Sequence, residues 1–121
     1  MIKFKSLNQN KQFIKILKKN KLNTKYFTIY FDKNSNNFKN KVNKYLNISF
    51  VMTKKVGNAV IRNRIKRKLK FAVQKASKIK HLIDLSYTYV IFGKNDVYKG
   101  KFSFILDEVN ETFKKIKEIR K

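Results

Sequence analysis

The chain contains no cysteine, no proline and no tryptophan, and it carries only seven acidic residues among 121. Without cysteine it can form no disulfide and no thiolate metal site, which suits a reducing compartment. The longest clear apolar run, Tyr89-Val90-Ile91-Phe92, is much shorter than the roughly 18 residues of a membrane span. The N-terminus also lacks the apolar segment and the small residues of a secretory signal. We therefore expect a cytoplasmic protein without a membrane span, and we do not expect a membrane among its partners.

A packed core is expected all the same. Hydrophobic residues make up 42% of the chain and include 11 Phe and 6 Tyr, which is too much apolar material for a disordered tail. The length fits one domain, and neither an internal repeat nor a Gly/Ser-rich linker divides it. We therefore expect a single domain over residues 1–121.

The charge balance narrows the choice of partners. Thirty-one Lys and Arg residues against seven Asp and Glu residues give a net charge of +24. From Lys33 to Ile83 there are fifteen cations and no acid. A folded domain this basic repels itself and is stabilised by a polyanion. Nucleic acid is the leading candidate, and an anionic membrane surface is the weaker alternative.

Apolar periodicity predicts six elements in the order α-β-β-α-β-α. These are a helix from Asn10, as its cap, to about Asn20, strands at Lys25–Phe31 and Tyr45–Thr53, a helix at Asn58–Lys80, a strand at Ser86–Phe92 and a helix at Ser103–Ile119. Asp32–Lys44 is predicted to be a loop and Gly93–Gly100 a turn region. This order predicts an α+β fold, a two-layer sandwich with helices packed on a small mixed sheet.

The alternation of residue types assigns the faces of these elements. In the first strand, Phe27, Ile29 and Phe31 point to one side, and Tyr26, Thr28 and Tyr30 point to the other. In the second strand, the predicted core residues are Leu46, Ile48, Phe50 and Met52. The apolar stripe of the long helix consists of Ile61, Ile65, Leu69, Ala72, Ala76 and Ile79. That of the last helix consists of Ile105, Val109, Phe113 and Ile116.

The most distinctive feature is the run KKVGNAVIRNRIKR at residues 54–67, called the signature run below. Cations line both margins of the apolar stripe, so the helix can pack on the sheet and still present them to phosphates. Three of the four arginines fall here in a chain that otherwise uses Lys, and the guanidinium fork can bind phosphate oxygens in bidentate fashion. The helix N-terminus at Asn58 adds backbone N–H groups and a partial positive charge. An ordinary solvated helix face is the alternative. The candidate nucleic-acid-binding residues are Lys54, Lys55, Asn58, Arg62, Asn63, Arg64, Lys66, Arg67, Lys68 and Lys70.

The residues give little support for an active site in the protein. The one histidine, His81, has no paired carboxylate in the sequence and is expected at the surface. No HExxH, Gly-rich phosphate loop or CxxC motif occurs. Asp107, Glu108 and Glu111 are spaced to complement the dipole of the last helix more readily than to bind a metal ion. We expect no catalytic residue, no metal site and no cofactor bound by the protein.

The signature run closely resembles that of the bacterial ribonuclease P proteins, in which Lys-Lys, Gly-Asn-Ala-Val, Arg-Asn-Arg and Lys-Arg occur in this order. Fourteen consecutive matching positions make the resemblance specific. The early helix, the strand around Phe27–Tyr30 and the late helix are also similar in order and spacing. Two features depart from the family: Lys70 and Phe71 stand where Arg and an acid often follow, and the loop Asp32–Lys44 is long and rich in Lys and Asn. Neither lies in the signature run.

The resemblance implies a ribosomal-protein-like fold with a left-handed β-α-β crossover around the signature helix. It also implies a subunit of the endoribonuclease that removes the 5′ leader of precursor tRNA, with hydrolysis carried out by a catalytic RNA and its magnesium ions. The implied partners are that RNA and precursor tRNA, with no obligate protein partner. The family holds the leader in a cleft between the first helix and the sheet. The matching residues here are Phe13, Leu17, Tyr26, Thr28, Tyr30, Ser49 and Val51.

Two questions stay open at this point. Phe13 can pack in the core or line the cleft, and the same holds for Tyr30. A ribosomal protein or ribosome-assembly factor would have the same composition and fold class, and a DNA-binding architectural protein is a further alternative. Only the signature run separates these classes from the family named above.

Overall fold

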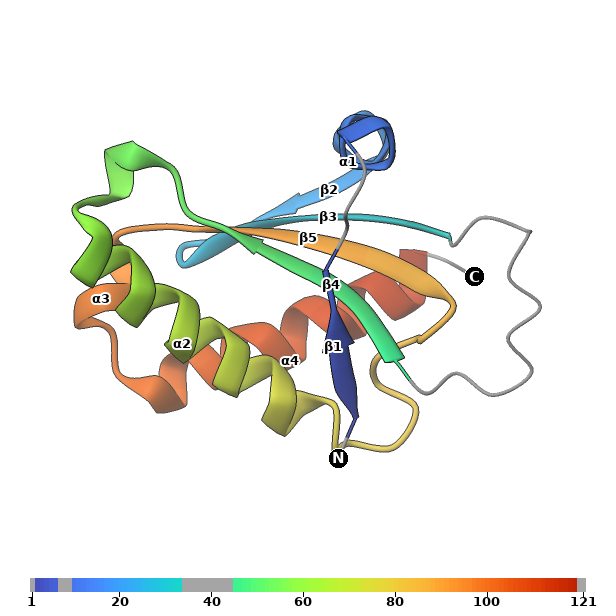
Figure 1. Cartoon of the computed structure of the whole chain (residues 1–121). Coiled ribbons are helices and arrows are strands. Elements are labelled where there is room, and N and C mark those ends of the chain that lie inside the picture. The colour runs from blue at the N-terminus through green and yellow to red at the C-terminus, as the bar shows by residue number, and fades with distance from the viewer. Residues whose placement is uncertain (1, 7–9, 34–44, 120–121) are drawn as a thin grey trace.

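A computed structural model describes residues 2–6, 10–33 and 45–119 (Figure 1). Its elements are β1 Lys3–Lys5, α1 Asn10–Leu17, β2 Asn20–Asn23, β3 Phe27–Lys33, β4 Tyr45–Val51, the 3-10 turn η1 Lys54–Val56, α2 Ala59–Ala76, β5 Tyr87–Gly93, α3 Asp96–Lys99 and α4 Phe102–Ile119. The six predicted elements are all present. Most of the loop predicted at Asp32–Lys44, and the side chain of the predicted cap Asn10, lie outside the described residues.

The strands form one mixed sheet in the order β1-β4-β5-β3-β2 (Figure 1). β1, β4 and β5 run parallel, whereas β3 is antiparallel to β5 and β2 is antiparallel to β3. The connection from β4 to β5 contains η1 and α2, so the signature run begins just after the end of β4. The predicted α+β fold, with helices packed on a small mixed sheet, is confirmed.

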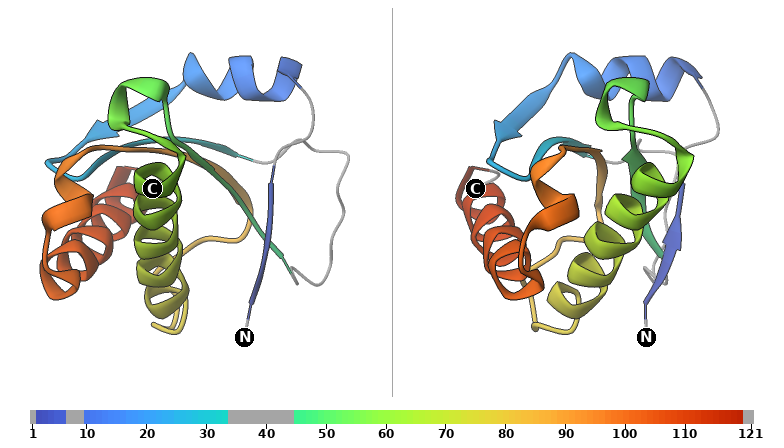
Figure 2. Two further views of the ribbon diagram at one scale, coloured as in Figure 1. Left: turned by 60° about the vertical axis from the view of Figure 1, so that its left-hand side comes forward. Right: turned by 90° about the vertical axis from the view of Figure 1, so that its left-hand side faces the viewer.

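The main core lies between one face of the sheet and the helices α2 and α4 (Figure 2). On β3 the side chains of Phe27, Ile29 and Phe31 are at most 1% exposed, as the strand alternation predicts. The α4 stripe is also confirmed, since Ile105, Val109, Phe113 and Ile116 are all buried. Full burial of each such side chain contributes about 1.5–3 kcal/mol. Phe50 and Met52 are partly buried and pack against this cluster.

Helix α1 lies over the opposite face of the sheet (Figures 1 and 2). Its Phe13 contacts Phe92 of β5, with ring centroids 6.3 Å apart. Phe92 is paired with Thr28 and alternates with the core residue Ile91, so it points away from α2 and α4. The helix therefore adds a partial third layer to the predicted two. We call this side of the sheet, with Phe13, Tyr30 and Phe92, the aromatic face.

Several boundaries differ from the predicted ones. The first helix ends at Leu17 and not near Asn20, because Asn20 begins the edge strand β2 and pairs with Phe31. Helix α2 ends at Ala76, so Ile79 lies beyond it and is 45% exposed. Val73 is buried in the helix stripe, although the pattern did not include it. The predicted turn at Gly93–Gly100 contains the short helix α3.

Candidate nucleic-acid interface

A glycine turn joins β4 to α2. Gly57 has φ 144°, a conformation that L side chains rarely adopt, and its N–H donates to the Lys54 carbonyl at 3.3 Å. A Cβ atom at this position would lie 3.1 Å from Cγ2 of Ile61. The side chains of Lys54 and Lys55 are exposed on the turn. Glycine therefore lets the chain reverse tightly while two lysines remain accessible.

Asn58 caps helix α2. Its Oδ1 accepts a hydrogen bond from the N–H of Ile61 at 3.0 Å, and its backbone is extended, with φ −73° and ψ 176°. The N–H groups of Ala59 and Val60 precede the intrahelical hydrogen bonds and so remain at the helix end. Asn58 thus acts mainly by fixing this N-terminus, whose partial positive charge favours an anion.

Exposed cations project from the surface of α2 that does not face the core. Arg64, Lys66, Arg67 and Lys70 are exposed, as is Asn63, the residue before Arg64. Arg62 is partly buried, and its Nε has no hydrogen-bond partner in the described part of the chain. The helix beneath is anchored by a buried stripe, so these cations stand on a fixed scaffold. We call the exposed cations Lys54, Lys55, Arg64, Lys66, Arg67 and Lys70 together the cation surface.

Lys68 does not belong to this surface. Its Nζ donates to the carbonyls of Val97, Tyr98 and Gly100, at 3.1, 2.9 and 3.2 Å. An ammonium group has three donors, and all three are used here. The structure gives Lys68 a role within the fold, which speaks against the predicted contact with phosphate: the side chain lies inward because α3 packs beside α2, and it satisfies the carbonyls at the end of α3.

The aromatic face holds most of the residues predicted for the cleft. Tyr30 and Phe92 lie edge-to-face, with ring centroids 5.6 Å apart, and Phe13 contacts the same Phe92 ring. The ammonium group of Lys21 lies 5.9 Å from the Tyr30 ring. Phe13 is therefore part of this cluster and not of the main core; its contact with a leader stays a prediction. Phe92 was missed, although its place in the strand alternation, opposite Ile91, could have revealed it.

Strand register aligns the other predicted positions on the same face. Tyr30 and Ser49 both pair with Val90 of β5, and Thr28 and Val51 both pair with Phe92. The Thr28 hydroxyl donates to Asn23 Oδ1 at 2.8 Å, and Ser49 is largely buried. Leu17 is partly buried at the end of α1. The sheet thus aligns predicted residues of two strands, β3 and β4, on either side of β5.

Tyr26 is the exception among the predicted cleft residues. Its side chain is only 9% exposed and belongs to the main core cluster, where it lies next to Gly100. Residues before Phe27 form the tight turn between β2 and β3, in which Thr24 Oγ1 accepts from the N–H groups of Tyr26 and Phe27 at 3.3 and 3.1 Å. The alternation begins at Phe27, so the predicted orientation of Tyr26 is wrong.

The remaining candidate groups stand apart from one another. Among the described residues, no three His, Cys, Asp or Glu side chains are placed to hold one metal ion. His81 is exposed, as predicted, with φ 65° in the segment after α2. No helix within the described ranges is long and apolar enough to cross a membrane. The accessible chemistry of both surfaces is therefore that of cations and aromatic rings.

Comparison with known proteins places this geometry in a family. The Ribonuclease P family model matches residues 1–117. The ribonuclease P protein component of Mesoplasma florum is 32% identical over 108 residues, covering 88% of this chain and 90% of its own. That of Carboxydothermus hydrogenoformans is 29% identical over 110 residues, covering 90% and 88%.

Solved structures show the same fold. The ribonuclease P protein of Thermotoga maritima superposes with a TM-score of 0.67 at 19% identity, covering 92% of this chain and 96% of its own. That of Staphylococcus aureus gives a TM-score of 0.63 at 23% identity, covering 92% and 93%. From the extent of the family match and the identity to its bacterial members, the chain belongs to the bacterial ribonuclease P protein component family, which acts in the 5′ processing of tRNA.

Proposed function

We propose that this protein binds the catalytic RNA of ribonuclease P through the cation surface and holds the 5′ leader of precursor tRNA on the aromatic face. Hydrolysis, which frees the mature tRNA 5′ end, is assigned to the RNA subunit and its magnesium ions. The chain itself contributes binding and positioning. We further propose that it acts in the cytoplasm.

The observation that carries this proposal is the way in which β4 links the two surfaces. Ser49 and Val51 align with the aromatic face, and Lys54 and Lys55 follow after only two further residues. Single-stranded RNA is bound by stacking on aromatic rings beside cations, and Tyr30, with Lys21 over its ring, supplies both. Structured RNA is bound mainly through its phosphates, which suits exposed Arg and Lys on a rigid helix.

A reconstitution experiment tests the division of labour. The protein, the cognate RNA, and both together are incubated with precursor tRNA at low magnesium concentration, and release of the leader is measured. We expect cleavage by the RNA to depend on added protein under these conditions, and we expect none from the protein alone. Cleavage by the protein alone would contradict the assignment of hydrolysis to the RNA.

The comparisons give no support to a ribosomal or ribosome-assembly role. That alternative predicts preferential binding to ribosomal RNA over the ribonuclease P RNA at the same salt concentration. Our proposal predicts the opposite order, and competition between the two RNAs for labelled protein distinguishes them.

A further inference from the structure

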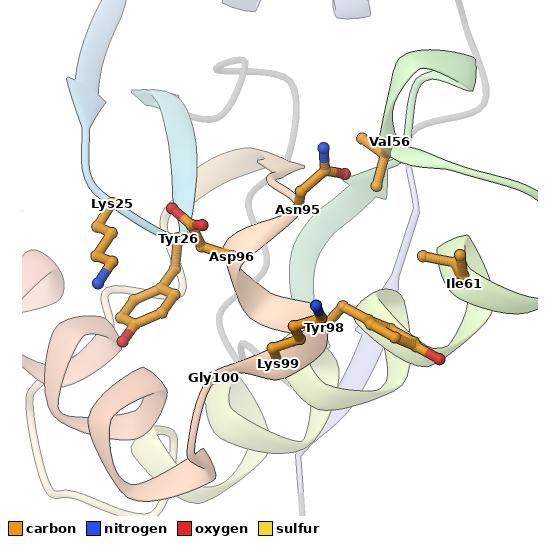
Figure 3. Close-up of a pocket in the computed structure, with 9 residues that line it drawn as sticks. All are labelled: Lys25, Tyr26, Val56, Ile61, Asn95, Asp96, Tyr98, Lys99 and Gly100. Carbon is orange, nitrogen blue, oxygen red and sulfur yellow. The ribbon is translucent and has the colours of Figure 1, made fainter.

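A cavity of about 570 Å³ lies beside the cation surface, and neither binding surface described above includes it (Figure 3). Val56 and Ile61 line it from the α2 side, and Lys25 lines it from the turn between β2 and β3. Its central wall is the segment from Asn95 to Gly100, which contains α3. We propose that this cavity binds one unpaired nucleotide of the RNA that the cation surface holds.

The cavity lies close to the residues proposed to bind RNA. Val56 ends η1, directly after Lys54 and Lys55, and Ile61 lies in the first turn of α2. An RNA backbone bound along these cations therefore passes the mouth of the cavity. A nucleotide that is unstacked at this point needs only to rotate from the cation surface into the neighbouring cavity.

The lining of the cavity has the chemistry that a nucleotide needs. Val56, Ile61 and the partly buried ring of Tyr98 offer flat or apolar surface for a base, and Figure 3 shows the Tyr98 ring reaching toward the start of α2. Lys25 and Lys99 are exposed cations for a phosphate, and they outnumber the one acid of the lining, Asp96. Stacking on aromatic and apolar side chains with nearby cations is how proteins bind unpaired nucleotides. The volume falls within the roughly 300–1,000 Å³ of small-ligand sites, which is ample for one nucleotide.

Hydrogen bonds hold the walls of the cavity in place. Lys68 binds three carbonyls of the α3 wall, and Val97 beneath it is fully buried. On the opposite side, Lys94 donates through Nζ to the Thr24 carbonyl at 2.5 Å and through its N–H to the Tyr26 carbonyl at 3.0 Å. Two lysines thus fix the walls before any ligand arrives, which lowers the cost of ordering on binding.

The first test uses a mononucleotide, because a base and a sugar phosphate can then be compared directly. The methyl resonances of Val56 and Ile61 are followed by NMR during titration with adenosine monophosphate and, separately, with ribose 5-phosphate. We expect the nucleotide to shift both and to bind about tenfold more tightly than ribose 5-phosphate. Equal affinity for the two ligands would show a purely electrostatic site and overturn the proposal.

Variants connect the cavity to RNA binding. Tyr98→Leu removes the ring while keeping apolar bulk, and its folding is checked by thermal melting. It should weaken both mononucleotide binding and binding to the cognate RNA, the latter by about fivefold or more. Lys99→Ala should weaken RNA binding more than Lys101→Ala, which removes the same charge from an exposed position outside the cavity. Unchanged binding by Tyr98→Leu, or equal losses for the two lysine variants, would overturn the proposal.

This inference rests on the proposed function, and Arg64→Ala tells their failures apart. If Arg64→Ala weakens RNA binding and the cavity variants do not exceed their control, the cavity proposal fails while the cation surface stands. If Arg64→Ala also binds the RNA normally, both proposals fail.

Discussion

Tyr30 lies where a ligand on the aromatic face can reach it. The neighbours of Tyr30 on β3, Ile29 and Phe31, are buried in the main core, whereas the Tyr30 ring is only partly covered and makes an edge-to-face contact with Phe92. Phe13 covers part of the same face from α1. A base can therefore stack here without displacing a residue of the main core.

Replacement of Tyr30 tests leader binding. Stacking of one base is worth ~1–3 kcal/mol, so Tyr30→Ala should weaken holoenzyme binding to precursor tRNA by about tenfold to a hundredfold. Binding to mature tRNA, which has no leader, should hardly change, and Tyr30→Phe should behave like the wild type. The measurement is the pair of dissociation constants at one stated salt concentration. Equal losses for both tRNAs would mean that the ring supports the fold or the RNA interface instead.

Lys68 and Lys66 lie two positions apart in α2 and should behave in opposite ways. Lys68→Met keeps an apolar stem but leaves carbonyls at the end of α3 without their donor, which costs about 1–3 kcal/mol of unfolding free energy. Lys66→Ala, at an exposed position, should leave stability unchanged and weaken RNA binding. Denaturant unfolding of both variants provides the comparison. Equal unfolding free energies would show that the three hydrogen bonds contribute nothing net.

On the proposed function, helix α2 separates an RNA-binding side from a side that packs in the core. Arg64→Ala and Arg67→Ala should each weaken binding to the catalytic RNA and make the log–log salt slope shallower by about 0.7–0.9, as expected for one lost phosphate contact. Ile65→Ala should instead lower the unfolding free energy by ~2–4 kcal/mol, since Ile65 is fully buried. Salt titrations and thermal melts measure the two effects. Arginine variants that melt early yet bind normally once folded would be structural.

The sequence predicted the elements that carry a strong apolar pattern and missed those that do not. β2 reads as polar because, of its four residues, only Leu22 packs against the core, and it forms by pairing with β3 at the edge of the sheet. In β1 only Phe4 is apolar and packs against the core, so the strand has no alternating pattern to detect. Such edge strands depend on partners distant in the chain, so local periodicity does not detect them.

The candidate site was predictable to a similar degree. Strand alternation placed Thr28, Tyr30, Ser49 and Val51 correctly on one face, because a period of two leaves little freedom once the strand is known. It placed Tyr26 wrongly because β3 begins at Phe27, two residues later than predicted. No local pattern distinguishes Lys68 from its exposed neighbours, since its partners lie 29 to 32 residues further along the chain.

At the scale of the whole molecule, the net charge of +24 couples folding to anions. The native state concentrates like charges on the cation surface, and any anion that binds only there stabilises the fold. Sulfate, phosphate or a short RNA should therefore raise the melting temperature more than chloride does at the same ionic strength. Thermal melts at matched ionic strength compare the melting temperatures in these anions and in chloride. Equal shifts would indicate general screening alone, without specific anion sites.

The position of β4 between the two surfaces has a consequence for the length of leader that the protein can use. β4 lies between β1, which pairs with Tyr45–Asn47, and β5, which pairs with Asn47–Val51, and the lysines before α2 follow two residues after its end. Because its hydrogen bonds keep β4 extended, on the proposed function it fixes the distance between the leader and the catalytic RNA. Leaders too short to reach from the cleavage point to Tyr30 would then gain nothing from the protein. The fold would thus set a minimum leader length without reading a single base.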